Sequence, residues 1–238
     1  MSSKPPVWQG YADPFVSVLE LRGFPVAITY TDKEIEPTVQ KGMSVCKAIP
    51  MAREGEIIRL NKAKCTCPGG TFHCGLGKEM PGMEKILVKG EKLWATVPIA
   101  RMSIAETHRI APPPLGLAKN IVFSPLNKAA LRPDLVIILC NAWQASRLIY
   151  LAIYYGESIK PNVSGSLCWG AITYPLMTGN FNVTMGDPTA RRHYGYDPND
   201  IIVSIPYRML PQMIESMEYS TAGRGKPAPW FDHAMDQV

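Results

Sequence analysis

Cysteine is the residue type in this sequence best suited to metal or redox chemistry. Cys65, Cys67 and Cys74 form a Cys-x-Cys-x6-Cys run inside a turn rich in glycine and proline. Thiolates that converge bind iron or zinc, and Gly69 and Gly70 let backbone N–H groups approach a bulky cluster or another anion. The spacing matches neither the ferredoxin run nor a zinc-finger pair, so a turn packed with small thiols is the alternative to a metal site.

The remaining cysteines, Cys46, Cys140 and Cys168, lie in other segments. Cys46 falls in an expected helix, and antiparallel packing of that helix on the next strand would bring it near Cys67. If Cys168 reached the same place, the site would lie in a crevice between two lobes, where sites commonly form. Cys140 ends an apolar strand and is better interpreted as a core thiol.

Positive charge and a histidine accompany the cysteine turn. Lys64, preceded by Arg59 and Lys62, could offset the charge of a thiolate-ligated cluster, although a solvated strand edge explains each of these residues as well. His73 lies within the turn and is the candidate proton donor. We therefore expect Gly69, Gly70 and Lys64 to contact a cofactor.

A second polar motif follows a strand near the C-terminal end of the chain. Asp187 and Pro188 open a helical turn that carries Arg191 and Arg192. A helix start with arginine suits a carboxylate or phosphate, and a pair of arginines that bridges surface acids is an equal alternative. We expect Arg191 or Arg192 to hold a small anionic substrate.

Composition limits the class of protein. The 238 residues include 46% apolar and 19% charged residues, which excludes a disordered chain. No apolar run approaches the ~20 residues of a membrane span, and the N-terminus lacks the apolar stretch of a signal peptide, so we expect a cytoplasmic protein without a membrane partner. The net charge of +5 is modest and its basic residues are scattered, which argues against nucleic acid as a partner.

The pattern of apolar residues predicts an α/β or α+β fold. We expect two mixed lobes with a cysteine-lined crevice between them: an N-terminal lobe over 1–110, a proline-rich connector over 111–119 and a C-terminal lobe over 120–238. The expected helices span 11–21, 44–54, 102–108, 142–155, 166–177 and 211–219. The expected strands span 24–30, 56–61, 120–124, 135–139, 181–185 and 201–206, with weaker strand patterns over 86–88 and 93–97. The aromatic residues of 148–155 would serve either the core or the surface of a homo-oligomer.

Four stretches together resemble the prokaryotic domain-of-unknown-function family 169, which is abundant in archaea and anaerobes. They are Val45-Cys46-Lys47 with Ala52-Arg53-Glu54-Gly55, Cys67-Pro68-Gly69-Gly70 with Gly75-Leu76-Gly77, Pro133-Asp134-Leu135-Val136-Ile137, and Gly186-Asp187 with Arg191. The resemblance covers about 14–220. It implies a site built on Cys46, Cys67 and Cys168, leaves the other three cysteines as additions, and implies no reaction.

Three cysteines from separate segments favour an iron–sulfur cluster, of the [4Fe–4S] type, with Cys65 as the expected fourth ligand. We expect an enzyme of anaerobic metabolism that acts on its substrate by Lewis-acid or reductive chemistry, as a metal-dependent lyase, hydrolase or reductase. Two alternatives stay open. One is a non-catalytic module that carries a cluster, zinc or a tetrapyrrole such as heme, and the other is a metal-free enzyme with Cys67 as the nucleophile.

Overall fold

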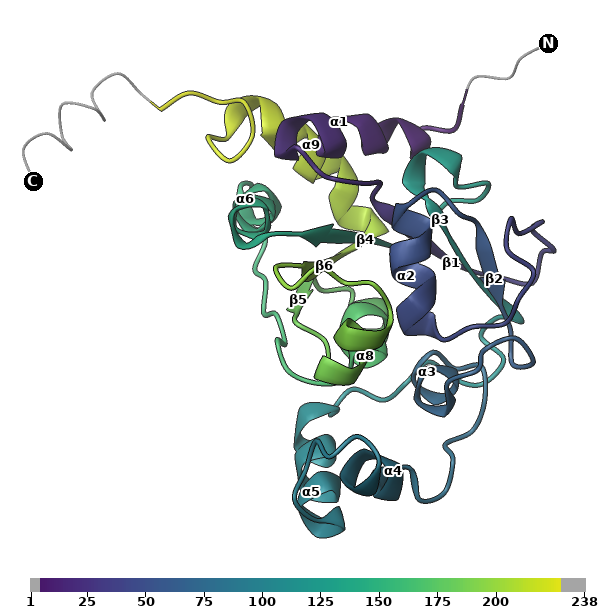
Figure 1. The fold of residues 1–238 in the computed structure, drawn as a ribbon. Helices are drawn as coiled ribbons and strands as arrows, with labels where there is room; N and C mark the ends of the chain where they lie inside the picture. The colour runs from purple at the N-terminus through teal and green to yellow at the C-terminus, as the bar shows by residue number, and fades with distance from the viewer. Residues whose placement is uncertain (1–4, 228–238) are drawn as a thin grey trace, which may run out of the picture.

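The computed structural model describes residues 5–227 and is built around one antiparallel sheet with helices on both faces (Figure 1). The strand order is β2-β3-β1-β4-β6-β5. The strands are β1 (Val26–Thr31), β2 (Ile58–Leu60), β3 (Asn120–Pro125), β4 (Leu135–Cys140), β5 (Asn182–Thr184) and β6 (Ile201–Pro206). The α/β prediction is confirmed.

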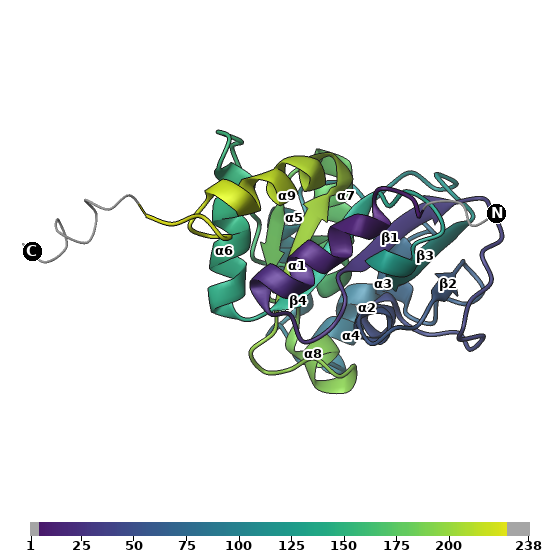
Figure 2. The same ribbon diagram turned by 90° about the horizontal axis from the view of Figure 1, so that it is seen from above.

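Helices form a layer on each side of this sheet, as Figure 2 shows from above. The α-helices are α1 (Ala12–Leu19), α2 (Val45–Arg53), α3 (Pro68–His73), α4 (Met83–Lys89), α5 (Val97–Thr107), α6 (Ala142–Ile153), α7 (Tyr174–Thr178), α8 (Pro188–His193) and α9 (Leu210–Tyr219). Short 3₁₀ turns are η1 (Gln9–Tyr11), η2 (Leu126–Lys128) and η4 (Tyr207–Met209), and η3 (Trp169–Thr173) is a π-helical turn. Helices α1, α6 and α9 cover one face, and α2, α3 and α8 cover the other.

Strand β4 is central, as its apolar sequence predicts, and all six of its residues are buried. Because successive side chains of a strand point to opposite faces, its residues divide between two cores. Ile137 and Leu139 pack toward α2, whereas Ile138 and Cys140 pack toward α1, α6 and α9. The sheet therefore separates two hydrophobic cores that share no space.

The ends of two helices follow from their sequence. Ser44 precedes α2, and its side chain accepts a 3.2 Å hydrogen bond from the backbone N–H of Lys47. Asn141 and Gln144 form a capping box at the start of α6, with reciprocal 2.9 Å hydrogen bonds.

In and just after α6 the aliphatic residues face the core, while Tyr150, Tyr154 and Tyr155 are exposed. The weaker strand predictions over 86–88 and 93–97 are wrong, since 86–88 lies within helix α4 and 93–97 contains no strand.

The proline-rich segment 111–119 does not divide the sheet into two lobes. Strand β1 pairs with β3 on one side and with β4 on the other, so strands from 1–110 and from 120–238 alternate in a single sheet. The prolines interrupt regular structure between α5 and β3, but they do not prevent strands on either side from pairing. Five of the six cysteines lie against one face of this single sheet rather than in a crevice between two lobes.

Within residues 5–227, no helix combines the length and the apolar composition that crossing a bilayer requires.

Gly42 is a position where the fold requires the absence of a side chain. A Cβ atom there would lie 2.7 Å from the carbonyl oxygen of Lys64, a backbone atom that cannot move aside easily. We expect Gly42→Ala to lower the free energy of unfolding by about 1–3 kcal/mol, measured by urea denaturation. The control is Gly10→Ala, where nothing lies within 4 Å. Equal stabilities for the two variants would contradict the packing described here.

Candidate functional site

Five of the six cysteines lie together on the α2 side of the sheet. Cys46, Cys65, Cys74 and Cys168 are buried members of one core, and Cys67 is partly exposed beside them. The Cys46 and Cys168 thiols are close enough to influence each other's ionisation. Four separate segments thus bring thiols to one place: α2, the turn after β2, the end of α3 and the start of η3.

A short parallel bridge positions Cys46 against the cysteine turn. The N–H of Met43 donates to the carbonyl of Lys64 at 3.0 Å, and the N–H of Thr66 donates to the carbonyl of Met43 at 3.1 Å. Helix α2 begins two residues later, so its first turn lies beside Cys65. The hydroxyl of Tyr196 then donates to the Cys46 carbonyl at 2.8 Å and fixes the helix from the opposite side.

Cys67 is the N-cap residue of α3. Its sulfur accepts the N–H of Gly70 at 3.4 Å, and its carbonyl accepts the Thr71 hydroxyl at 2.9 Å. Gly70 has little room for a side chain, because a Cβ atom would lie 3.2 Å from Val45 and 3.7 Å from the sulfur of Cys65. Gly69 likewise lies next to the Cys67 sulfur, so both predicted glycines border the thiols.

Asp187 holds the segment that carries Cys168. Its carboxylate accepts the N–H of Leu167 at 3.2 Å and the N–H of Ala190 at 2.7 Å, so one side chain joins the start of α8 to the residue before Cys168. The hydroxyl of Ser166 lies 3.8 Å from the Cys168 sulfur. The π-helical turn η3 begins directly after Cys168, and such turns are frequent at functional sites.

The thiols differ in their tendency to ionise. The adjacent Cys46 thiol holds the pKa of Cys168 below its usual value, whereas the adjacent Cys168 thiol and burial hold the pKa of Cys46 well above it. Burial raises the pKa of Cys65, Cys67 and Cys74, and the nearby Cys168 raises each of them further. In the free protein, therefore, Cys168 is the thiol best placed to ionise, and several thiolates at once require a cationic partner.

Cys140 lies apart from the site, in the core on the other face of the sheet. Its thiol donates to the carbonyl of Ile201 at 3.6 Å, and burial raises its pKa to about 12. This arrangement agrees with its interpretation as a core thiol. Cys74, which the sequence left as an addition, instead belongs to the site, and the Tyr30 hydroxyl binds its carbonyl at 3.3 Å.

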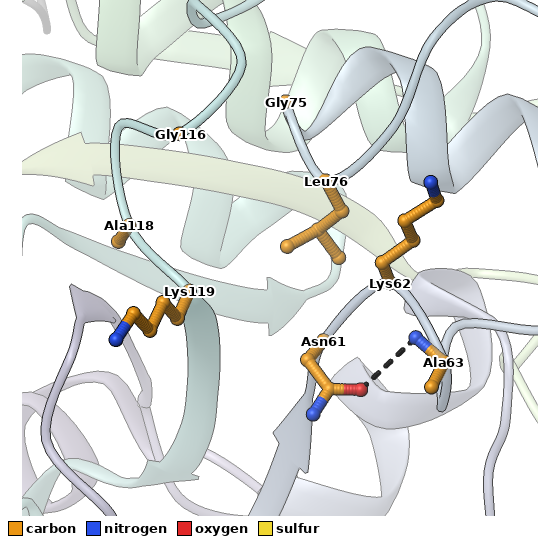
Figure 3. A pocket seen from close by; sticks show the side chains of 8 residues that line it. All are labelled: Asn61, Lys62, Ala63, Gly75, Leu76, Gly116, Ala118 and Lys119. Carbon is orange, nitrogen blue, oxygen red and sulfur yellow. Dashed lines mark hydrogen bonds between the residues drawn. The ribbon is translucent and has the colours of Figure 1, made fainter.

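Two pockets flank the cysteine turn. One of about 420 Å³ adjoins Cys74 through Gly75 and Leu76, and Figure 3 shows Lys62 and Lys119 on either side of Leu76. Another of about 290 Å³ lies on the other side and is lined by residues that include Ser44, Lys47, Thr66 and Tyr194. Lys64 borders neither of them, because its ammonium group donates to the Gln40 side chain at 3.3 Å. Arg59 is likewise engaged, in an ion pair with Glu34.

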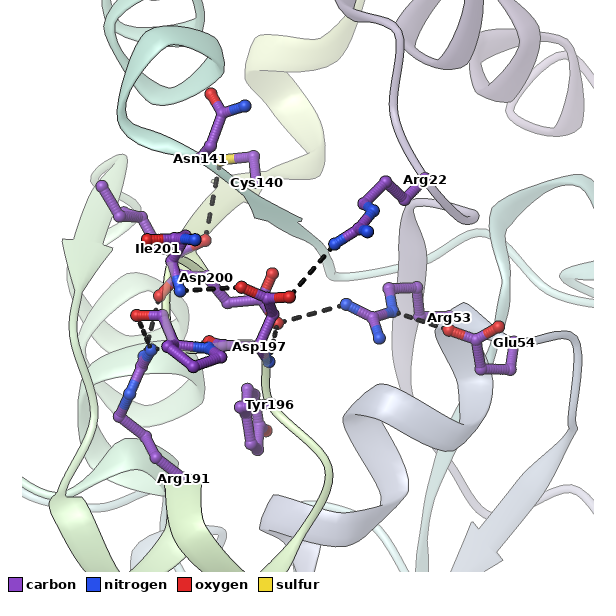
Figure 4. A network of polar contacts seen from close by, with 12 residues as sticks. Arg22, Arg53, Glu54, Cys140, Asn141, Arg191, Tyr196, Asp197, Asp200 and Ile201 are labelled. Carbon is purple, nitrogen blue, oxygen red and sulfur yellow. Dashed lines mark hydrogen bonds and ion pairs between the residues drawn. The ribbon is translucent and has the colours of Figure 1, made fainter.

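Arg191 serves the loop that follows it. Its guanidinium group donates four hydrogen bonds of 2.7–3.0 Å to the backbone carbonyls of Met185, Asp197, Pro198 and Asp200. Figure 4 shows Arg191 beside Asp197 and Asp200. Asp200 in turn forms a 3.2 Å ion pair with Arg53 of α2. Arg192, next in sequence, is exposed. The geometry thus gives Arg191 a structural position, and no cysteine contacts either arginine.

His73 lies beside His108, a residue that sequence reasoning missed. The ring centroids are 4.9 Å apart, and burial lowers the pKa of His73 to about 3 and that of His108 to about 4. Both imidazoles are therefore neutral at pH 7. His108 stands at the end of α5, far from the cysteines in sequence, and no local motif marks it.

The comparisons place the chain in an uncharacterised group. Residues 15–216 match the sequence profile of DUF169, described as "Uncharacterised ArCR". The uncharacterized protein MJ0308 of Methanocaldococcus jannaschii is 24% identical over 190 residues, which are 73% of this chain and 76% of that protein. No solved structure matches the chain.

The two adjacent arginines provide a matched test of the loop. Arg191→Ala removes four hydrogen bonds from a charged donor, and we expect it to lower the free energy of unfolding by about 2–4 kcal/mol. Arg192→Ala removes an exposed side chain and should change it by less than about 0.5 kcal/mol. Urea denaturation measures both. If Arg191→Ala is as stable as the wild type, the structural role is wrong and Arg191 is again a candidate for binding a ligand.

His108 should make the protein less stable in mild acid. Its pKa is about 4 in the folded chain and about 6.5 when unfolded, so the unfolded chain takes up the proton first as pH falls. The stability contributed by the neutral ring is complete above pH 6.5 and is lost as pH falls toward 4. We expect His108→Phe to reduce the drop in unfolding free energy between pH 7 and pH 5, while exposed His193→Phe leaves that drop unchanged.

Proposed function

This chain belongs to DUF169, an uncharacterised family, and we propose that it is an iron–sulfur enzyme whose cluster is bound by Cys46, Cys67 and Cys168. The observation that carries the proposal is the convergence of five thiols from four segments, four of them in one core and Cys67 partly exposed beside it. Cys65 and Cys74 are the candidates for a fourth ligand. A set of soft thiolates is the donor set that iron–sulfur clusters use.

Thiolates bind both zinc ions and iron–sulfur clusters. Within residues 5–227, no three His, Cys, Asp or Glu side chains form a group that could hold a metal ion. The proposal of a cluster therefore depends on the neighbouring thiols and on the family resemblance, and measurement of bound iron and sulfide decides between a cluster and zinc.

The surroundings of the thiols support the same proposal. Cys168 is already poised to ionise, and the mutual repulsion that raises the pKa of its neighbours is relieved when iron supplies positive charge. Gly69 and Gly70 present backbone without side chains next to Cys67. Asp187 and Tyr196 hold the segments that carry Cys168 and Cys46, as supports of ligands commonly do.

A bound cluster supplies Lewis acidity when one iron lacks a protein ligand, and electron transfer when four thiolates bind it. The chain's own residues would receive a small anionic substrate beside it. Lys62 and Lys119 give positive charge to the pocket that adjoins Cys74. The neutral rings of His73 and His108 offer polar atoms on another side of the thiols.

A second candidate is a metal-free cysteine enzyme, and the lowered pKa of Cys168 is the observation that favours it. The nucleophile would then be Cys168 rather than Cys67, whose pKa is raised by burial. Cys168 is only 4% exposed, which limits access of a substrate to its sulfur. Rapid labelling of Cys168 alone in metal-free protein would support this candidate.

The test of the first proposal is anaerobic purification, reconstitution with iron and sulfide, and measurement of bound iron, sulfide and the visible spectrum. We expect equal amounts of iron and sulfide and a broad charge-transfer band. Cys46→Ala, Cys168→Ala and Cys67→Ser should each lose most of the bound iron. Serine is itself a good N-cap residue, so Cys67→Ser removes the ligand and retains the start of α3.

Cys140→Ala is the matched control, because it removes a buried thiol on the other face of the sheet. It should retain the iron content of the wild type. Cys65→Ser and Cys74→Ser then identify the fourth ligand, if one exists. A colourless protein after reconstitution, or equal iron loss in the Cys140 control, would overturn the proposal.

A further inference from the structure

His73 and His108 carry two buried ring nitrogens that lack hydrogen-bond partners. Nδ1 of each ring is inaccessible to solvent and makes no hydrogen bond within the described part of the chain. The two rings are nearly perpendicular, at 85°. His108 also stacks on Trp169 with a centroid distance of 4.7 Å, and a 3.0 Å bond to the Ile110 carbonyl anchors the indole. The pair is therefore rigidly placed but polar and unsatisfied.

A backbone contact fixes the tautomer of His108. The N–H of Ser166 donates to Nε2 of His108 at 3.2 Å. A backbone amide can only donate, so Nε2 carries the lone pair and the proton of the neutral ring is on Nδ1. The unpartnered atom is thus an N–H donor. A buried donor without an acceptor costs free energy, which a ligand that supplies an acceptor recovers.

The pair adjoins the thiols on two sides. His73 directly precedes Cys74. Ser166, the partner of His108, places its hydroxyl 3.8 Å from the Cys168 sulfur. Asp187 accepts two backbone N–H groups with separate oxygens and supplies no acceptor to the rings.

We propose that His108 Nδ1–H, with His73 beside it, binds an oxygen acceptor of a small molecule held at the cysteine site. The inference rests on the proposed function in one respect, that this molecule is the substrate. A carboxylate and a neutral carbonyl share the required chemistry. Acetate and acetamide, which have nearly the same shape, distinguish them.

The experiment uses the full chain with ¹⁵N-labelled histidine, reconstituted anaerobically, and records the ring nitrogens by NMR. Free protein should show His108 protonated on Nδ1. Titration with acetate, and separately with acetamide at equal ionic strength, should shift the His73 and His108 nitrogens in a saturable way. Saturation by acetate alone assigns a carboxylate, and saturation by acetamide assigns a carbonyl.

His108→Phe keeps an aromatic ring against Trp169 and removes the donor, so we expect it to weaken binding of the effective probe by about tenfold or more. His193→Phe, at an exposed histidine of α8, should bind that probe as the wild type does.

Three results would overturn the inference: protonation of His108 on Nε2, ring nitrogens that respond to neither probe because only an ordered water occupies the site, or unchanged affinity in His108→Phe. The first two are measured on the wild type and do not depend on how the variant folds. Iron content is measured on the same samples. If the protein binds no iron but its His73 and His108 nitrogens still shift with the probe, the proposed iron–sulfur function is wrong and the proposed binding by His108 is retained.

Discussion

The side of the sheet toward which a residue points decides which cysteines can act together. Alternation along β4 directs Cys140 into the core beneath α1, α6 and α9, while the other five thiols belong to the opposite layer. No side-chain motion carries a group through a hydrogen-bonded sheet whose two faces are both packed. The elements that position these thiols are α2, α3, η3 and α8, and they all lie on the same side of the sheet. Asp187, Tyr196 and the bridge between Met43 and Cys65 join those elements to each other.

Charge is the second constraint on this layer. Five adjacent thiols, four of them buried, cannot ionise together, because burial and mutual repulsion both favour the protonated form. Cys168 is the exception, because the adjacent Cys46 thiol lowers its pKa while the pKa of Cys46 itself is raised. Burial also disfavours the charged form of His73 and His108, but because that form is a cation, burial lowers their pKa values. The thiols and imidazoles of the site therefore carry little charge, whereas the adjoining pocket carries the positive charge of its lysines. The chemistry of the site depends on the metal group or ligand that binds there.

Local signals predicted much of the fold. Ser44, Asn141 and Asp187 begin helices where the sequence indicates, and the apolar runs of β4 and β6 are strands at the centre of a sheet. The pairing of β1 with strands from both halves was not predictable, because register and neighbour choice are set by long-range packing. The resemblance to a family indicated Cys46, Cys67 and Cys168 but not Cys74, which joins them only because the short helix α3 turns it inward. Arginine fits anions and carbonyls equally well, so only geometry could show that Arg191 binds its own loop.

The sequence separation between Cys46 and Cys168 affects how the protein must be made. About half of the chain lies between them, and β4 and β6, which complete the sheet beneath the site, are both translated after Cys74. During synthesis four thiols leave the ribosome before Cys168 or the supporting strands exist. Until then they lack the buried surroundings of the finished site and are open to oxidants, which convert neighbouring thiols into disulfides. The site can therefore close only late in synthesis, when Cys168 and β6 have both emerged.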